Sequence, residues 1–417
     1  MDPSNIEDTF ELNEEDIEEV IEFNNSPSQP EALAEGMEDM DLDQYDGDGG
    51  VEDEDKENST SLPLRDDADL VFTEHKGSVF CVQADPVKCE FAVSGGEDDL
   101  AYLWKIDSGQ VVLKCTGHKD SVTQVAFSHD SQYLATGDMS GIIKVWKVDT
   151  KVEIWSFECT DLEWLRWHHC AHILLAGTVD GEMWMWKIPG GDCKTFQGQG
   201  CTCSEGRILP DGKRACTGYD DGTVKIWDLK EGSPLHSISG HDAHDGAITC
   251  IDCHPDNVMV VTGSVDVTAK VINSNNGKVV TTFNCKKQSS ETDASAAEKE
   301  DSVEAVGCSP NNPYLATGTL AGSLCFWDLT KQTVRQQCDN EAGIVRLKWD
   351  NTSPMVYTGS LDGTVRLWDA RTGKTEAQWM GHGAEILDLT ISRDGNHLLT
   401  SSSDETVRVY SLHSPDR

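Results

Sequence analysis

The sequence predicts an all-β protein, an eight-bladed β-propeller that follows a disordered acidic segment. The first observation is a hairpin unit, clearest at residues 359–369, in which an Asp-Gly turn joins two alternating strands and Trp-Asp closes the second. The second is that eight copies of this unit recur between residues 70 and 412. Most copies are spaced by about 40–45 residues, the period of a four-stranded propeller blade. The third is composition, because Val, Ile, Thr and Trp strands alternate with Gly-rich turns.

The copies share one register, anchored on the residue that closes each hairpin. In chain order this residue is Trp104, Trp146, Trp186, Trp227, Ile272, Trp327, Trp368 and Tyr410. Six residues earlier stands an acid in the turn, at Asp98, Asp180, Asp221, Asp266, Asp362 and Asp404, whereas Ser140 and Ala321 break this rule. A single hairpin is marginal in water. We therefore expect the eight units to pack into one ring and one domain.

The pattern resembles the WD-repeat family, and the resemblance implies a buried hydrogen-bond network of His, Ser or Thr, Asp and Trp in each blade. Only the first copy is expected to hold all four, as His75, Ser94, Asp98 and Trp104. Partial networks are expected at His118, Thr136, Trp146, His244, Thr262, Asp266, Thr358, Asp362, Trp368, His382, Thr400 and Asp404. Four copies carry Glu158, Gln199, Lys299 and Asn340 in place of the His, so we expect those blades to be less rigid.

The chain divides into a tail, a propeller and two short polar segments. Residues 1–69 hold 26 Asp and Glu against two basic residues, so this segment is predicted to be disordered. Its residues 14–23 are either part of a solvated acidic tail or a short amphipathic helix that folds against a basic groove. The propeller spans residues 70–412, with a flexible insertion at 288–301 and a tail at 413–417. The resemblance implies that residues 70–72 pair with the last strand, which removes open sheet edges.

Charge and cysteine content limit the function classes. The net charge of −41 argues against nucleic acid or an anionic membrane as a direct ligand, and it favours partners with basic segments. Fifteen cysteines, with no signal peptide and no apolar run of membrane-spanning length, predict reduced thiols in the cytosol. A monomeric ring without a transmembrane segment is expected.

No motif predicts catalysis, a cofactor or a metal. The run 250–254 contains Cys250, Cys253 and His254, but no second Cys pair follows at the spacing of a zinc site. The runs 201–203 and 168–170 also lack a defined ligand set. Every strong His–Asp–Ser/Thr combination is explained by the blade network. We therefore expect a protein that is not an enzyme, with no catalytic, cofactor-binding or metal-binding residues.

The surface remains as the candidate for function. In WD-repeat proteins the residue before the turn acid projects onto the narrower top face, where partners dock. The equivalent residues are Glu97, Met139, Val179, Asp220, Val265, Leu320, Leu361 and Ser403. Five of them are large and apolar, which favours a docking surface, although loops that fold over them are the alternative. Trp164 lies outside the core positions of the repeat, which allows two interpretations: a packing role, which is favoured, or a partly exposed side chain that joins this surface as a candidate partner-binding residue.

A narrower resemblance is carried by residues 117–121, 127–131, 135–141, 161–164, 191–198 and 360–373. It implies a cytoplasmic scaffold, peripherally associated with the cell membrane, that acts in cell migration and, in vertebrates, angiogenesis. The alternative is a dedicated chaperone that escorts a basic large-subunit ribosomal protein. Binding of a short basic segment should be strongly salt-dependent, whereas apolar docking should be less so.

Overall fold

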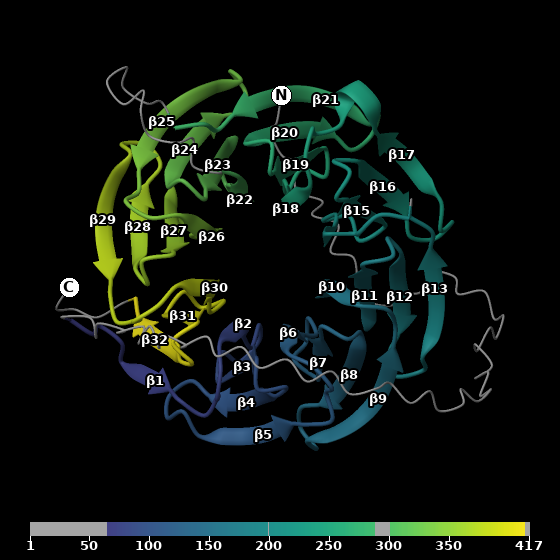
Figure 1. Ribbon diagram of the computed structural model, residues 1–417, viewed down its shortest axis with the longest axis vertical. Coiled ribbons are helices and arrows are strands. Elements are labelled where there is room, and N and C mark those ends of the chain that lie inside the picture. Colours follow the sequence, from purple (N-terminus) through teal and green to yellow (C-terminus); the bar gives the residue numbers. More distant parts are fainter. Residues whose placement is uncertain (1–64, 199, 288–300, 413–417) are drawn as a thin grey trace, which may run out of the picture.

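Eight four-stranded antiparallel sheets surround a central channel in the computed structural model (Figure 1). The structure describes residues 65–198, 200–287 and 301–412. The predicted all-β propeller with eight blades is confirmed. The predictions for residues 1–64, 288–300 and 413–417, together with those for Gln199 and Lys299, lie outside the described residues.

In the first seven blades the strands follow chain order from the channel outwards. The first four blades are β2 (Val79–Ala84), β3 (Phe91–Gly96), β4 (Ala101–Lys105) and β5 (Val111–Cys115); β6 (Val122–Phe127), β7 (Tyr133–Asp138), β8 (Ile142–Lys147) and β9 (Val152–Glu158); β10 (Leu162–Trp167), β11 (Ile173–Thr178), β12 (Met183–Lys187) and β13 (Asp192–Phe196); β14 (Glu205–Ile208), β15 (Arg214–Gly218), β16 (Val224–Asp228) and β17 (Pro234–Ile238).

The next three blades are β18 (Ile248–Cys253), β19 (Met259–Ser264), β20 (Thr268–Asn273) and β21 (Lys278–Asn284); β22 (Val303–Cys308), β23 (Tyr314–Thr319), β24 (Ser323–Asp328) and β25 (Thr333–Asp339); β26 (Ile344–Trp349), β27 (Met355–Ser360), β28 (Val365–Asp369) and β29 (Lys374–Trp379). The eighth blade contains β30 (Ile386–Ile391), β31 (His397–Ser402), β32 (Val407–Ser411) and, as its outer strand, β1 (Leu70–Phe72). A short 3-10 helix, Gly240–Asp242, precedes the fifth blade.

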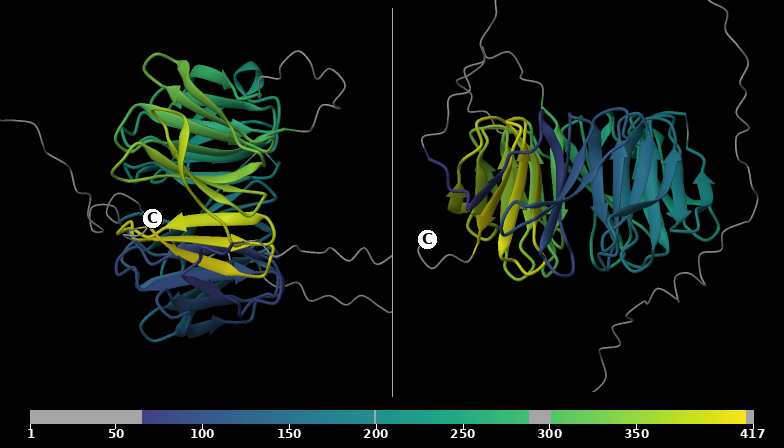
Figure 2. Two further views of the ribbon diagram at one scale, coloured as in Figure 1. Left: turned by 90° about the vertical axis from the view of Figure 1, so that its left-hand side faces the viewer. Right: turned by 90° about the horizontal axis from the view of Figure 1, so that it is seen from below.

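The ring closes as predicted, by antiparallel pairing of β1 with β32. Phe72 is buried at this seam, and its ring stacks on that of Trp104 with 4.6 Å between centroids. Figure 2 shows the ring from two further sides, with the blades standing side by side in one layer. Because β1 pairs with the edge of β32, the first and last strands of the propeller close the ring by backbone hydrogen bonds.

The hydrophobic core lies between neighbouring blades. The middle strands β7 and β11 are buried on both faces, since each sheet is packed between two others. At the blade five and six boundary, for example, the rings of Phe283 and Trp327 stack 4.4 Å apart. Among the described residues, no helix is long and apolar enough to cross a membrane.

Two faces result from this arrangement. We call the top face the side that carries the turns between the second and third strands of each blade. We call the bottom face the side that carries the loops between the first and second strands.

Candidate functional site

The residues predicted for the top face occupy one equivalent position in all eight blades. Each donates its backbone N–H to a carbonyl oxygen that precedes the first strand of its blade, over distances between 2.9 and 3.1 Å. The donors are Glu97, Met139, Val179, Asp220, Val265, Leu320, Leu361 and Ser403. This bond fixes the backbone of each turn at the rim of the first strand.

Four of the five apolar side chains at this position are exposed. The exposed fractions are 49% for Met139, 41% for Val179, 48% for Val265 and 37% for Leu320. Leu361 is half-buried. Within the described residues, loops therefore do not bury this ring of apolar side chains.

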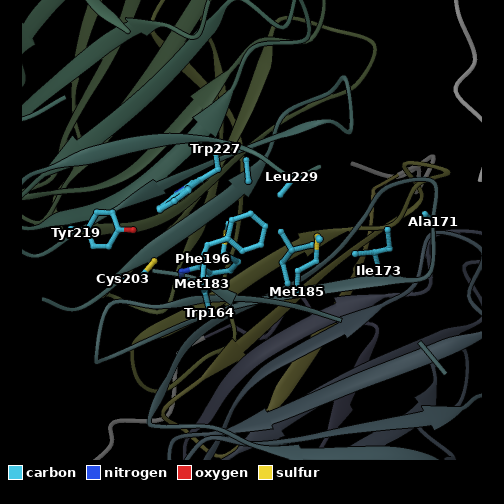
Figure 3. Close-up of a cluster of buried hydrophobic side chains, with 12 residues drawn as sticks. Trp164, Ala171, Ile173, Met183, Met185, Phe196, Cys203, Tyr219, Trp227 and Leu229 are labelled. Atoms are coloured by element: carbon cyan, nitrogen blue, oxygen red, sulfur yellow. The ribbon is translucent and has the colours of Figure 1, made fainter. Parts of the chain in front are cut away.

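Trp164 does not belong to this surface: its packing role is confirmed, and the alternative of a partly exposed partner-binding residue is wrong. It is 2% exposed and packs between the third and fourth blades, with Phe196, Cys203 and Tyr219 in the same cluster (Figure 3). Two glycines make the space. A Cβ atom on Gly177 would lie 2.0 Å from the Nε1 atom of Trp164, and one on Gly206 would lie 2.2 Å from its Cζ2 atom.

The predicted His, Ser, Asp and Trp residues of the first blade form one buried network. The Nε2 atom of His75 lies 2.9 Å from Oγ of Ser94, and its Nδ1 atom lies 3.0 Å from Oδ1 of Asp98. The indole N–H of Trp104 donates to the same Ser94 oxygen over 3.2 Å. These side chains hold the top-face turn against the loop that enters the blade.

The second blade also holds all four members, which corrects the prediction that only the first does. His118 contacts Thr136 at 2.8 Å and Asp138 at 3.1 Å, and Trp146 donates to Thr136 over 3.1 Å. The six-residue spacing before Trp146 places the acid at Ser140, so it does not identify Asp138. The available signal was a reversed order of residues. Four other blades have Ser or Thr, any residue, then Asp, at residues 178–180, 264–266, 360–362 and 402–404, whereas residues 138–140 are Asp-Met-Ser.

The remaining predicted members form the partial networks expected of them. In the fifth blade, His244 contacts Thr262 at 2.9 Å and Asp266 at 3.0 Å. In the eighth, His382 contacts Thr400 at 2.7 Å and Asp404 at 2.9 Å. In the seventh, the indole N–H of Trp368 donates to Thr358 over 2.9 Å, and Arg366 pairs with Asp362 at 2.7 Å.

The top-face turns are strongly acidic. The turns at 97–100, 139–141, 179–182, 220–223, 265–267, 320–322, 361–364 and 403–406 contain eleven Asp or Glu residues and no Lys or Arg. Burial acts to raise the pKa of Asp98, but the hydrogen bond and charge of His75 outweigh it, so this pKa is lowered. The pKa values of Asp266 and Asp404 are lowered in the same way by His244 and His382. The network therefore keeps these turn acids negatively charged.

Acids crowd together where the third and fourth blades meet on this face. Burial raises the pKa of Glu163, and the charges of Asp220 and Asp161 raise it further. Burial and Asp180 likewise raise the pKa of Glu182. These shifts mean that the carboxylates repel one another, and a cationic group placed among them would relieve that repulsion.

The central channel has a different charge pattern from the face above it. It forms a cavity of about 640 Å³ lined by the first strands of the blades. Inside it, Arg166 pairs with Glu205 at 3.1 Å and Arg346 pairs with Asp388 at 3.3 Å, while Lys348 lines the same cavity. Acidic and basic side chains thus occur together inside the channel, whereas the charged residues of the top-face turns themselves are all acids.

Comparisons with known proteins give a consistent assignment. A family model described as WD domain, G-beta repeat, matches residues 109–147 and 191–228, and one described as Nucleolar protein 10-like, N-terminal domain, matches residues 241–410. The chain is 48% identical over 411 residues to the angio-associated migratory cell protein of Homo sapiens, which covers 97% of this chain and 95% of that protein.

More distant similarities concern ribosome assembly. The chain is 24% identical over 371 residues to the ribosome assembly protein SQT1 of Saccharomyces cerevisiae, with 81% of this chain and 83% of that protein covered. The crystal structure of Sqt1 from Chaetomium thermophilum bound to the N-terminus of ribosomal protein L10 is similar with a TM-score of 0.74 at 19% identity. The match covers 84% of this chain and 100% of that one, and it shows a shared fold.

Proposed function

Because the chain belongs to the angio-associated migratory cell protein family of WD-repeat propellers, we propose that it is a scaffold that binds partner proteins on its top face and catalyses no reaction itself. The observation that supports this proposal is the ring of exposed apolar residues set among turns that contain acids and no basic residues. Apolar groups at the centre of an interface supply binding energy, and a charged rim supplies orientation and association rate.

The chemistry of this face defines the partner. Met139, Val179 and Val265 would contact apolar side chains of the partner, because each leaves about half of its surface in solvent. The acids around Glu163 and Asp220 would contact Lys or Arg side chains. We therefore propose a partner segment that combines apolar and basic residues.

The cellular role that we propose follows the relatives. The name of the human relative supports a role in cell migration. We extend the proposal to a cytoplasmic protein whose association with the cell membrane is peripheral and depends on bound partners.

A variant with two charges on the top face tests the binding surface. In Met139→Asp/Val265→Asp, both changes lie on side chains that are about half exposed, so the fold should be retained. The matched control is Val152→Asp/Val334→Asp, which changes residues that are 55% and 50% exposed on the outer strands β9 and β25. Partners captured from cell lysate by the unmodified chain should be lost by the first variant and kept by the second. Equal capture by both would refute top-face docking.

A second candidate function is escort of a basic ribosomal protein. It is favoured by the similarity to the ribosome assembly protein SQT1 and by the Sqt1 complex with the N-terminus of ribosomal protein L10. An acidic top face could cover a basic segment of such a protein and keep it soluble before assembly.

A peptide with the N-terminal sequence of ribosomal protein L10 separates the two functions. If the chain is an escort, titration calorimetry should show binding that weakens strongly between 50 and 300 mM salt, because charged contacts are screened. The Asp220→Asn/Glu163→Gln variant should weaken this binding further. Absence of binding by the full chain at low salt would eliminate the escort function and leave the scaffold proposal intact.

A further inference from the structure

A group of metal-ligating side chains lies on the bottom face, away from the proposed docking surface. His129 and Asp130 are in the loop between β6 and β7 of the second blade, and His172 precedes β11 of the third blade. One potential ligand atom of each lies within 4.8 Å of those of the other two. We propose that His129, Asp130 and His172 form a binding site for a divalent transition-metal ion of the Zn²⁺ class.

The Asp130 carboxylate is held in an orientation suited to a ligand. Its Oδ1 atom accepts hydrogen bonds from the Ser128 hydroxyl at 2.8 Å and from the backbone N–H of Gln132 at 3.0 Å. Its Oδ2 atom faces Nε2 of His172 at 2.9 Å. One oxygen is therefore fixed by the loop while the other faces the His172 imidazole, as in sites where outer contacts orient a metal ligand.

The two imidazoles come from different blades and meet beside this oxygen. The ring centroids of His129 and His172 are 5.2 Å apart, and the His172 ring packs edge-on against Tyr133 with 4.8 Å between centroids. The side chains of His172 and Asp130 are 14% and 25% exposed. Both are therefore largely buried, but an ion from solvent can still reach them. A bound ion would replace the hydrogen bond between His172 and Asp130 with two coordination bonds, one to each of these side chains.

The donor set selects the class of ion. Two imidazole nitrogens and one carboxylate oxygen suit Zn²⁺, and they leave a fourth tetrahedral position for water. Ca²⁺ and Mg²⁺ prefer sites made only of oxygen ligands. The net charge of −41 also raises the local concentration of cations around the protein.

A neighbouring group, His168, His169 and Cys170, has equally close potential ligand atoms, but backbone groups engage both ring nitrogens of His168. Nε2 of the buried His168 lies 2.9 Å from the carbonyl oxygen of Gly212, and its Nδ1 atom accepts the backbone N–H of Cys170 at 3.3 Å. With both ring nitrogens engaged, His168 holds the loops of the third and fourth blades together. The proposed ion would link the second and third blades in a comparable place.

Titration of the chelator-treated full chain with Co²⁺ and Zn²⁺ tests the site. We expect one Co²⁺ per chain with the intense visible absorption of a four-coordinate complex, displacement by one Zn²⁺, and a Zn²⁺-dependent rise in melting temperature. His129→Ala and His172→Gln should each weaken binding about tenfold or more, and both should abolish the rise in melting temperature. The glutamine retains an N–H that can donate to Asp130.

Two control variants locate the ion. His241→Ala removes a histidine that is 93% exposed and lies 3.3 Å from Asp242, so it tests for adventitious binding at a surface His–Asp pair. Cys170→Ser tests the neighbouring group. Binding should survive both changes. Loss of binding in either control, unchanged affinity in His129→Ala and His172→Gln, or absence of stoichiometric binding would overturn the proposal.

Discussion

The Nδ1 atom of His118 lies 3.1 Å from Oδ2 of Asp138, although this acid stands at the end of β7 and not in the turn that follows. Ser140 occupies the usual acid position and donates its hydroxyl to the other oxygen of Asp138 at 2.8 Å. The two side chains are in direct hydrogen-bond contact where the strand passes into the turn, so the acid and the hydroxyl can exchange places without losing the network.

The first prediction concerns this exchange. His118→Ala should lower the melting temperature, because buried Thr136 and Asp138 would lose a partner at a cost of about 2–3 kcal/mol. Asp138→Ser and Ser140→Asp should each destabilise the protein, whereas the double variant restores the usual order and should recover most of the loss. Melting temperatures of the four variants are compared with that of the unmodified chain. A double variant no more stable than either single one would contradict the exchange.

Acid should destabilise the ring through the same network. The pKa of Asp138 is lowered to about 2, because the His118 hydrogen bond and backbone N–H donors outweigh the effect of burial. An unfolded Asp titrates at about 3.9, so the unfolded chain binds more protons between about pH 2 and 4. The stabilisation is therefore present above about pH 4 and is lost as the pH falls through this window.

Buried His382 extends this loss to higher pH. Burial lowers its pKa, so protonation below about pH 6.5 favours the unfolded chain. Urea unfolding midpoints at pH 7, 5 and 3 should fall steadily. Asp138→Asn should be less stable at pH 7 but should lose less between pH 5 and 3. A parallel decline in both proteins would exclude Asp138 as a source of the acid sensitivity.

The next prediction concerns the space around Trp164. Gly206→Ala should lower the melting temperature, because the added Cβ would lie 2.2 Å from the indole. Trp164→Ala should leave a cavity and cost about 3–5 kcal/mol. In Trp164→Phe/Gly206→Ala the smaller ring makes room for the methyl group. The loss of stability in this double variant should therefore be less than the sum of the losses in Trp164→Phe and in Gly206→Ala. Gly383→Ala is the control, because nothing lies within 4 Å of its added Cβ.

The last prediction concerns the seam. Phe72→Ala should loosen β1, since Phe72 is 2% exposed and stacks on Trp104. Val71→Ala is the matched control on the same strand, because Val71 is 38% exposed. We expect a lower melting temperature and concentration-dependent association on size-exclusion chromatography for Phe72→Ala only, because an uncovered β32 edge can pair with another chain. Identical behaviour of the two variants would show that Phe72 does not hold the seam.

Sequence alone determined the number of blades, the register of the repeats and the eight equivalent top-face positions. These depend on strand alternation, turn residues and spacing, which are properties of short stretches of chain. The spacing rule did not identify Asp138, because it assigns the acid to the turn position of Ser140, whereas the last residue of the strand can also reach His118.

Only the tertiary structure decided what happens between blades. Trp164 is buried because Gly177 and Gly206, on neighbouring strands of two different sheets, leave room for its ring. His172 meets Asp130 because the second and third sheets stack with their bottom loops side by side. A repeat pattern describes each sheet by itself, whereas these contacts depend on how adjacent sheets pack, and that is set by the closed ring as a whole.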